Sequence, residues 1–205
     1  KISDNFLWNY GIDMTRYSQG KVDVSWRNWI PDWVDSSLEG NIPESITINY
    51  PIRQDGKNIY EENGMSRWIG LTYDVRNQKI SSLYGLSKES LRASDYPVTT
   101  DIDKIKKYIA QGGYYATNIW NQNVENGKKV EILLNTPEIA YVHTLDTSSE
   151  KPEEYYVPAL IFHVSNKPVD SYIGDTIIIP IIDDFMKGNS RWWQLPYMTP
   201  DLMER

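Results

Sequence analysis

Cysteine is absent from this chain of 205 residues, and histidine occurs only at positions 143 and 163. Without a thiol, the chain can form no disulfide, no iron–sulfur cluster and no cysteine-ligated zinc site. Neither His143 nor His163 belongs to a His-x-x-x-His or His-Glu pair of the kind that zinc sites use. We therefore expect structural or solvent-facing histidines, no metal site and no cofactor.

Basic residues are fewer than acidic residues, with 21 Lys and Arg against 28 Asp and Glu and a net charge of -7. A protein that binds nucleic acid or an anionic membrane surface needs a basic stripe. The one dense basic cluster, at 104–107, stands beside Asp101 and Asp103 and is typical of a solvated helix face. No apolar run approaches the ~20 residues of a membrane helix. We expect no nucleic-acid partner, and membrane attachment only through an anchor that this sequence does not contain.

The usual catalytic motifs are missing too. There is no Gly-x-Ser-x-Gly elbow, no phosphate-binding glycine loop and no Asp-x-Asp-x-Asp-Gly calcium loop. Carboxylate pairs such as Glu153-Glu154 and Asp183-Asp184 occur, but an acidic chain supplies such pairs at no distinctive spacing. These absences predict a protein that is not an enzyme.

Tryptophan and tyrosine are in excess, with 8 Trp and 15 Tyr against 3 Phe. Their large apolar rings carry a polar tip, which suits binding surfaces as well as cores. Five tryptophans cluster near the two ends of the chain and are our candidate ligand-binding residues: Trp26, Trp29, Trp33, Trp192 and Trp193. The alternative is that these side chains fill the core, as large aromatic residues commonly do.

Alternating polar and apolar residues predict strands through much of the chain. Asp55-Gly56 between two strand-like runs predicts a hairpin over 45–60. The segments 67–75 and 80–84 form a second expected hairpin, and the first 40 residues show no period and predict short strands or loops. Three later strands are expected, at 138–145, 155–164 and 176–182. Pro158 and Pro180 lie in the last two, which predicts an edge or a bulge at each proline. A symmetric loop over 146–154 would place His143 opposite Pro158 and His163 opposite Glu138, so the two histidines should not touch.

A short helix is expected to begin after Thr100 or Asp101, either of which can cap it, and to end at Gly112-Gly113. Ile102, Ile105 and Ile109 have helical spacing and define its apolar face. Successive strands lack crossover helices, which argues against a parallel α/β sheet. We therefore predict an α+β fold, a mostly antiparallel sheet with one or two short helices packed on it. Its expected parts are a Trp-rich region over 1–66, a helix-on-sheet unit over 67–186 and an aromatic tail over 187–205.

A family resemblance spans about residues 68–182. It rests on the approach to the helix, the helix with its Gly-Gly end, and the strands that follow, at 94–98, 101–113, 130–132, 138–141 and 154–162. These segments resemble the PepSY-like domains of extracytoplasmic bacterial proteins. Such domains include membrane-anchored regulators of the cell-wall histidine kinase and uncharacterised proteins of candidate-phylum bacteria. The resemblance implies a cystatin-like helix on an antiparallel sheet, an upstream membrane anchor and no catalytic residues.

The leading functional hypothesis is therefore a non-enzymatic binding or regulatory domain of a bacterial envelope protein. Its expected location is extracytoplasmic, and its expected partner is another envelope protein or a domain of the same full-length protein. A carbohydrate-binding module or glycan-processing enzyme, with the clustered tryptophans as a stacking platform, is one alternative. A peptidase-inhibitor-like domain is another.

Overall fold

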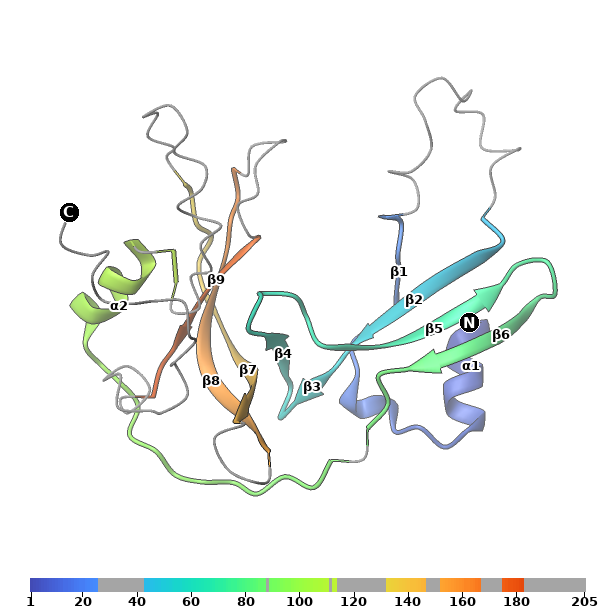
Figure 1. The fold of residues 1–205 in the computed structure, drawn as a ribbon, viewed down its shortest axis with the longest axis horizontal. Coiled ribbons are helices and arrows are strands. Elements are labelled where there is room, and N and C mark those ends of the chain that lie inside the picture. Colours follow the sequence, from blue (N-terminus) through green and yellow to red (C-terminus); the bar gives the residue numbers. More distant parts are fainter. Residues whose placement is uncertain are drawn as a thin grey trace. The chain divides into compact units, whose positions relative to one another are not determined.

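The computed structural model describes residues 1–25, 43–87, 89–110, 112–113, 132–146, 152–166 and 175–182. These residues form α-helices and mostly antiparallel strands, which confirms the predicted α+β class (Figure 1). The chain divides into two compact units, which we call unit 1 (Lys1–Asn58 and Ser66–Arg92) and unit 2 (Ile59–Met65 and Ala93–Arg205). The division differs from the boundary expected near residue 66, because residues 66–92 fold with the first part of the chain.

Unit 1 is built on a four-stranded antiparallel sheet with the spatial order β1-β2-β5-β6. Its strands are β1 (Lys21–Val22), β2 (Ser45–Pro51), β5 (Trp68–Asp74) and β6 (Lys79–Tyr84). Strands β5 and β6 form the hairpin expected at 67–84. Asp74 Oδ1 stabilises its turn by accepting a hydrogen bond of 2.8 Å from the Asn77 amide.

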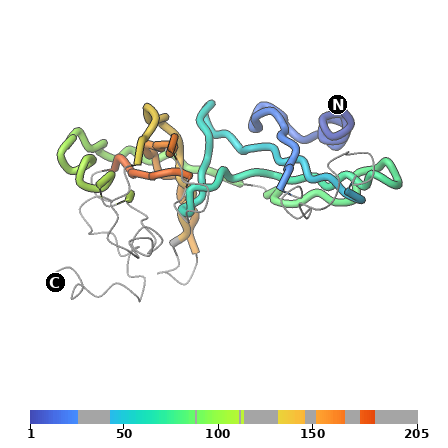
Figure 2. Tube along the Cα trace, turned by 90° about the horizontal axis from the view of Figure 1, so that it is seen from above, coloured from blue at the N-terminus to red at the C-terminus, as the bar shows by residue number. Residues whose placement is uncertain are grey.

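The first residues of unit 1 form a helix where we expected short strands or loops. Helix α1 (Ile2–Asn9) is followed by a 3₁₀ turn at Met14–Arg16. Only Ser3 and Leu7 of α1 are buried, and one pair at this spacing is too short a pattern to reveal a helix in the sequence. The helix lies on one face of the unit 1 sheet, whose strands Figure 2 shows nearly edge on.

The hairpin predicted over 45–60 exists only around its turn. Strand β3 (Arg53–Gln54) pairs with the start of β4 (Lys57–Glu61). Asp55 and Gly56 both have positive φ, as the tight two-residue turn requires. The remainder of the predicted first strand is β2, which pairs with β1 and β5 instead, so the prediction was wrong for residues 45–51.

The sheet of unit 2 has the neighbour order β4-β7-β8-β9. Strands β7 (Glu138–Asp146), β8 (Glu153–His163) and β9 (Thr176–Pro180) are antiparallel and lie where strands were predicted. The end of β4 joins β7 in parallel, through the pairs Ile59 with Tyr141, Tyr60 with Val142 and Glu61 with His143. This parallel edge was not expected.

The prediction that both strand prolines lie at an edge or bulge holds for one of them. Pro180 is the last residue of β9, the final strand of the described sheet. Pro158 lies in the central strand β8. In an antiparallel ladder, the nitrogen and the carbonyl of one residue point toward the same neighbouring strand. The Pro158 carbonyl accepts a hydrogen bond from the Ile181 amide, so the Pro158 nitrogen points in that direction too. The Pro158 nitrogen therefore faces the residue that follows β9, and its lack of an N–H removes no hydrogen bond between β8 and β9.

Helix α2 (Ile102–Ala110) confirms the predicted helix and its cap, because Asp101 Oδ1 accepts from the Lys104 amide at 3.0 Å. Ile105, Tyr108 and Ile109 pack against Phe162, Ile177 and Ile179 of the sheet. Burial raises the pKa of the Tyr108 phenol. Ile102 is 64% exposed, so its predicted place on the packed face was wrong.

The chain leaves α2 through the two glycines expected to end it. Gly112 and Gly113 have φ of +89° and +107°, and the Gly113 amide donates to the Tyr108 carbonyl at 2.8 Å. A Cβ on Gly113 would also lie 3.3 Å from backbone atoms of Ile178. A side chain at position 113 would therefore be strained by its backbone conformation and crowded against β9.

The two faces of the unit 2 sheet carry different side chains. One face holds a buried cluster made of Tyr60, Ala140, Val142, Ala159, Ile161 and Ile178. Since side chains alternate along a strand, Tyr141, His143 and Leu145 of β7 point to the opposite face. Helix α2 packs on the part of that opposite face formed by β8 and β9. His143 lies on the same face, near the β4 edge.

Candidate functional site

A compact turn places acidic side chains at the β4 edge of unit 2. The turn follows β4, with the Glu61 amide donating to the Met65 carbonyl at 2.8 Å and the Gly64 amide donating to the Glu61 carbonyl at 2.9 Å. Asn63 Oδ1 accepts from the Met65 amide at 2.9 Å. Ile59 and Tyr60 anchor the segment, with exposed fractions of 0% and 5%. Glu61 and Glu62 are therefore presented from a hydrogen-bonded support.

His143 on β7 lies between two carboxylates. Its Nδ1 is 2.8 Å from Glu61 Oε2 on β4, and its Nε2 is 3.0 Å from Glu154 Oε2 on β8. The Tyr156 ring on β8 packs against the imidazole edge, with ring centroids 5.8 Å apart. The His143 side chain is 15% exposed, whereas those of Glu61 and Glu154 are 36% and 54% exposed. Three strands thus meet at one histidine near the surface.

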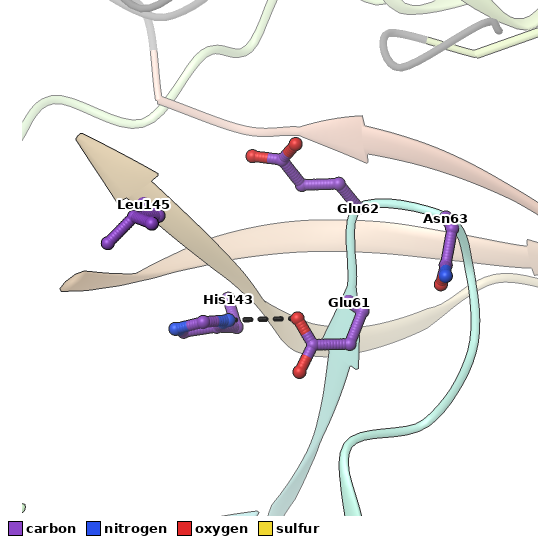
Figure 3. Close-up of a pocket in the computed structure, with 5 residues that line it drawn as sticks. All are labelled: Glu61, Glu62, Asn63, His143 and Leu145. Atoms are coloured by element: carbon purple, nitrogen blue, oxygen red, sulfur yellow. Dashed lines mark hydrogen bonds and ion pairs between the residues drawn. The ribbon is translucent and has the colours of Figure 1, made fainter. Parts of the chain in front are cut away.

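A pocket of about 360 Å³ opens beside this histidine. It is lined by Glu61, Glu62, Asn63, His143 and Leu145 (Figure 3). Glu61 and His143 point toward one another in this view, and Leu145 lies farther along β7. Leu145 is 50% exposed and gives the pocket an apolar wall beside its acidic groups. The pocket therefore offers carboxylate oxygens and a hydrocarbon surface together.

The other face of the same edge carries a second polar group. Tyr60 donates a hydrogen bond to Glu138, and His163 Nε2 lies 3.5 Å from both Glu138 Oε1 and Tyr60 Oη. Thr144 donates to the Glu62 carboxylate on the same face. Residues 60–62 thus contact both faces of the sheet through alternating side chains.

Hydrogen-bond chemistry limits what His143 can do. A carboxylate is only an acceptor, and a neutral imidazole has one N–H and one lone pair. Both ring nitrogens can donate to Glu61 and Glu154 only in the protonated imidazolium form. A histidine held in this way has no lone pair with which to remove a proton from a substrate. The geometry suits a structural ion pair and a cation-attracting rim better than general-base catalysis.

The predicted positions of the two histidines are corrected by the β7–β8 register. We expected His143 opposite Pro158 and His163 opposite Glu138, from a symmetric loop over 146–154. His143 is instead opposite Tyr156, and Glu138 is opposite Ile161. The register differs by two residues, which keeps every side chain on its expected face. His163 therefore still reaches Glu138, diagonally across the two strands.

The five candidate tryptophans, Trp26, Trp29, Trp33, Trp192 and Trp193, lie outside the described residues. Two other tryptophans are described. Trp8 on α1 is 75% exposed, with Tyr10 close in sequence and 72% exposed. Trp68 on β5 packs edge-on against Tyr84, with ring centroids 5.4 Å apart. The choice between binding surface and core for the five candidates stays open.

Sequence reasoning did not identify Glu61 and Glu154 as partners of His143. The alternation of β7 showed the face of His143, but the parallel pairing of β4 with β7 has no local signal in the sequence. In the part of the chain that the structure describes, no group of three or more His, Cys, Asp or Glu side chains is arranged to hold a metal ion. Likewise, none of the described helices is both long and apolar enough to cross a bilayer.

Comparisons of the chain with protein-family models, with curated proteins and with solved structures found no match. The PepSY-like resemblance therefore stays a prediction, and the residues of the site carry the functional argument.

Proposed function

We propose that this chain is a non-enzymatic binding domain and that the pocket beside His143 receives a cationic side chain of a protein partner. The observation that carries the proposal is the composition of that pocket. Glu61 and Glu62 supply negative charge, and Leu145 supplies an apolar wall. A lysine side chain has this complementary form, because its ammonium group is borne on a hydrocarbon stem that packs on apolar surface.

Two further features support binding over catalysis. His143 has both ring nitrogens directed at carboxylates, which favours a charged and fixed imidazole. The net charge of -7 would also increase the encounter rate with a basic partner. An extracytoplasmic envelope location remains part of the proposal and rests on the family resemblance alone.

A fluorescent tetralysine peptide provides a direct test. We expect saturable binding by fluorescence anisotropy at about 0.15 M salt, where long-range attraction is largely screened. Glu62→Gln removes one pocket charge and should weaken binding about two- to fivefold, the size of one partly exposed charge pair. Asp103→Asn, on the exposed first turn of α2, makes the same change in net charge outside the pocket.

The expected result is a clear loss of affinity for Glu62→Gln and no loss for Asp103→Asn. Equal losses in the two variants would show that the peptide responds to net charge, and the pocket proposal would be rejected. A peptide with four acetylated lysines has the same length without the charge and should not bind. Binding of that peptide with the same affinity would also contradict the proposal.

A further inference from the structure

We propose that residues 59–65 are held against the sheet of unit 2 by a clasp of side-chain contacts, and that a proton on His143 tightens this clasp. This inference concerns a conformational device and does not depend on which ligand enters the pocket. Both histidines of the chain lie at this edge, with His143 beside Glu61 and His163 beside Glu138.

The backbone attachment of the 59–65 segment is short. Strand β4 joins β7 through the pairs of Ile59, Tyr60 and Glu61 alone, whereas β7 and β8 are paired along the whole of β7. A short ladder at the edge of a sheet supplies little cooperative stability. Side-chain contacts must therefore account for much of the hold on this segment.

Those side-chain contacts involve four of the seven residues of the segment. Tyr60 donates to Glu138, and Glu61 faces His143 at 2.8 Å. Thr144 donates to Glu62, and Thr176 Oγ1 donates to the Gly64 carbonyl at 3.1 Å. We define the clasp by the four segment residues Tyr60, Glu61, Glu62 and Gly64 and by the strand residues that they contact.

The charge on His143 decides how many of its bonds can form. Glu61 faces it from β4, and Glu154 and Tyr156 face it from β8. Glu62, from the turn after β4, lines the same pocket. The imidazolium donates to both Glu61 and Glu154, whereas the neutral ring can donate to only one. Once the proton is lost, one ring nitrogen presents a lone pair to the other carboxylate, and the two acceptors repel each other.

The direction of the pH effect follows from this geometry. Histidine changes charge between about pH 5 and 8, so the clasp should tighten as pH falls through that range. His163 contributes less, because its Nε2 lies 3.5 Å from Glu138 Oε1 and from Tyr60 Oη, at the limit of a hydrogen bond.

Amide hydrogen exchange measures the clasp directly. We expect the protection factors of residues 60–62, corrected for the intrinsic pH dependence of exchange, to be about two- to fivefold higher at pH 5.5 than at pH 8.5. The paired strands β2 and β5 of unit 1 serve as an internal reference, and their protection should not follow the same change. Equal protection of residues 60–62 at the two pH values would overturn the proposal.

Two histidine variants identify the group responsible. His143→Gln cannot take up a proton and should abolish the pH dependence at residues 60–62, while the matched His163→Gln should keep most of it. Glu154→Gln tests the same point with His143 intact. An amide at position 154 can donate to the neutral imidazole, so the pH effect should shrink. An unchanged pH effect in both His143→Gln and Glu154→Gln would contradict the assignment to His143.

Discussion

Tyr50 shows how one buried hydroxyl joins helix α1 to the sheet of unit 1. Its ring is 1% exposed, and its Oη lies 2.6 Å from Asp4 Oδ1 and 2.7 Å from Ser3 Oγ. The bond from Tyr50 lowers the pKa of the Asp4 carboxyl. Burial, with a further contribution from Asp4, raises the pKa of Tyr50 to about 12. The neutral phenol is therefore favoured in the folded protein.

This shift predicts a loss of stability at alkaline pH. The ordinary pKa of tyrosine is about 10, so the contribution is complete below pH 10 and is lost as the pH rises toward 12. At pH 11 the free energy of unfolding should fall by about 1 kcal/mol through Tyr50 alone. Tyr50→Phe should lack that part of the alkaline loss in urea unfolding measured at pH 8 and pH 11.

Tyr10→Phe is the matched control, because Tyr10 is in the same unit and is 72% exposed. This variant should keep the alkaline loss of the wild type. An alkaline loss of the same size in Tyr50→Phe would show that Tyr50 does not titrate as described. Tyr50→Phe should also cost about 1 kcal/mol at neutral pH, the usual value of a buried hydrogen bond.

Among the elements, α2 illustrates how a cap and a packed face together define a short helix. Asp101 satisfies the Lys104 amide at one end, and the two glycines end the helix at the other. Ile105 and Ile109 supply the face that packs on the sheet. Helices of this length are marginal in water alone, so both contributions are needed.

Asp101→Ala should destabilise α2 by about 1 kcal/mol, the usual cost of removing an N-terminal cap. Asp101→Asn keeps an oxygen acceptor and should lose little. The measurement is amide exchange within 105–110, where the alanine variant should show about fivefold lower protection and the asparagine variant should be near wild type. Equal protection in the alanine variant and the wild type would mean that Asp101 does not cap the helix in solution.

Elements with complete local signals were predictable from the sequence. The β5–β6 hairpin has alternating side chains on both strands, and α2 has a cap, an apolar spacing and a Gly-Gly end. Helix α1 was missed because only Ser3 and Leu7 face the core. The pairing of β4 with β7 was missed for a different reason: it joins residues about 80 positions apart, and neither strand encodes its partner locally.

The residues of the candidate site also differ in how far the sequence predicts their positions. The strand that carries His143 was predictable from its alternation, and the two-residue register error leaves His143 on the same face of the sheet. Its partner Glu61 depends on the long-range parallel pair and could not be found in this way. For Glu154, the sequence shows only a carboxylate pair of no special spacing. Local patterns thus located the strands of the site, and tertiary pairing selected the residues that meet there.

At the scale of the whole molecule, the chain forms two compact units and carries a net charge of -7. Such a charge attracts any cation weakly, so affinity for a basic peptide alone cannot locate a site. The described part of unit 2 concentrates carboxylates and an apolar wall at one pocket, which is the central claim of the proposed function. A test of the proposed function must therefore show which residues the peptide contacts.

The most direct test is a ¹H–¹⁵N correlation NMR titration with tetralysine at pH 7 and about 0.15 M salt. If the pocket binds the peptide, the amide signals of the pocket residues shift together and saturate at one affinity: Glu61, Glu62, Asn63, His143 and Leu145. The acetylated peptide should leave them unchanged. Shifts spread evenly over the acidic residues of both units, or confined to residues outside the pocket, would contradict the account.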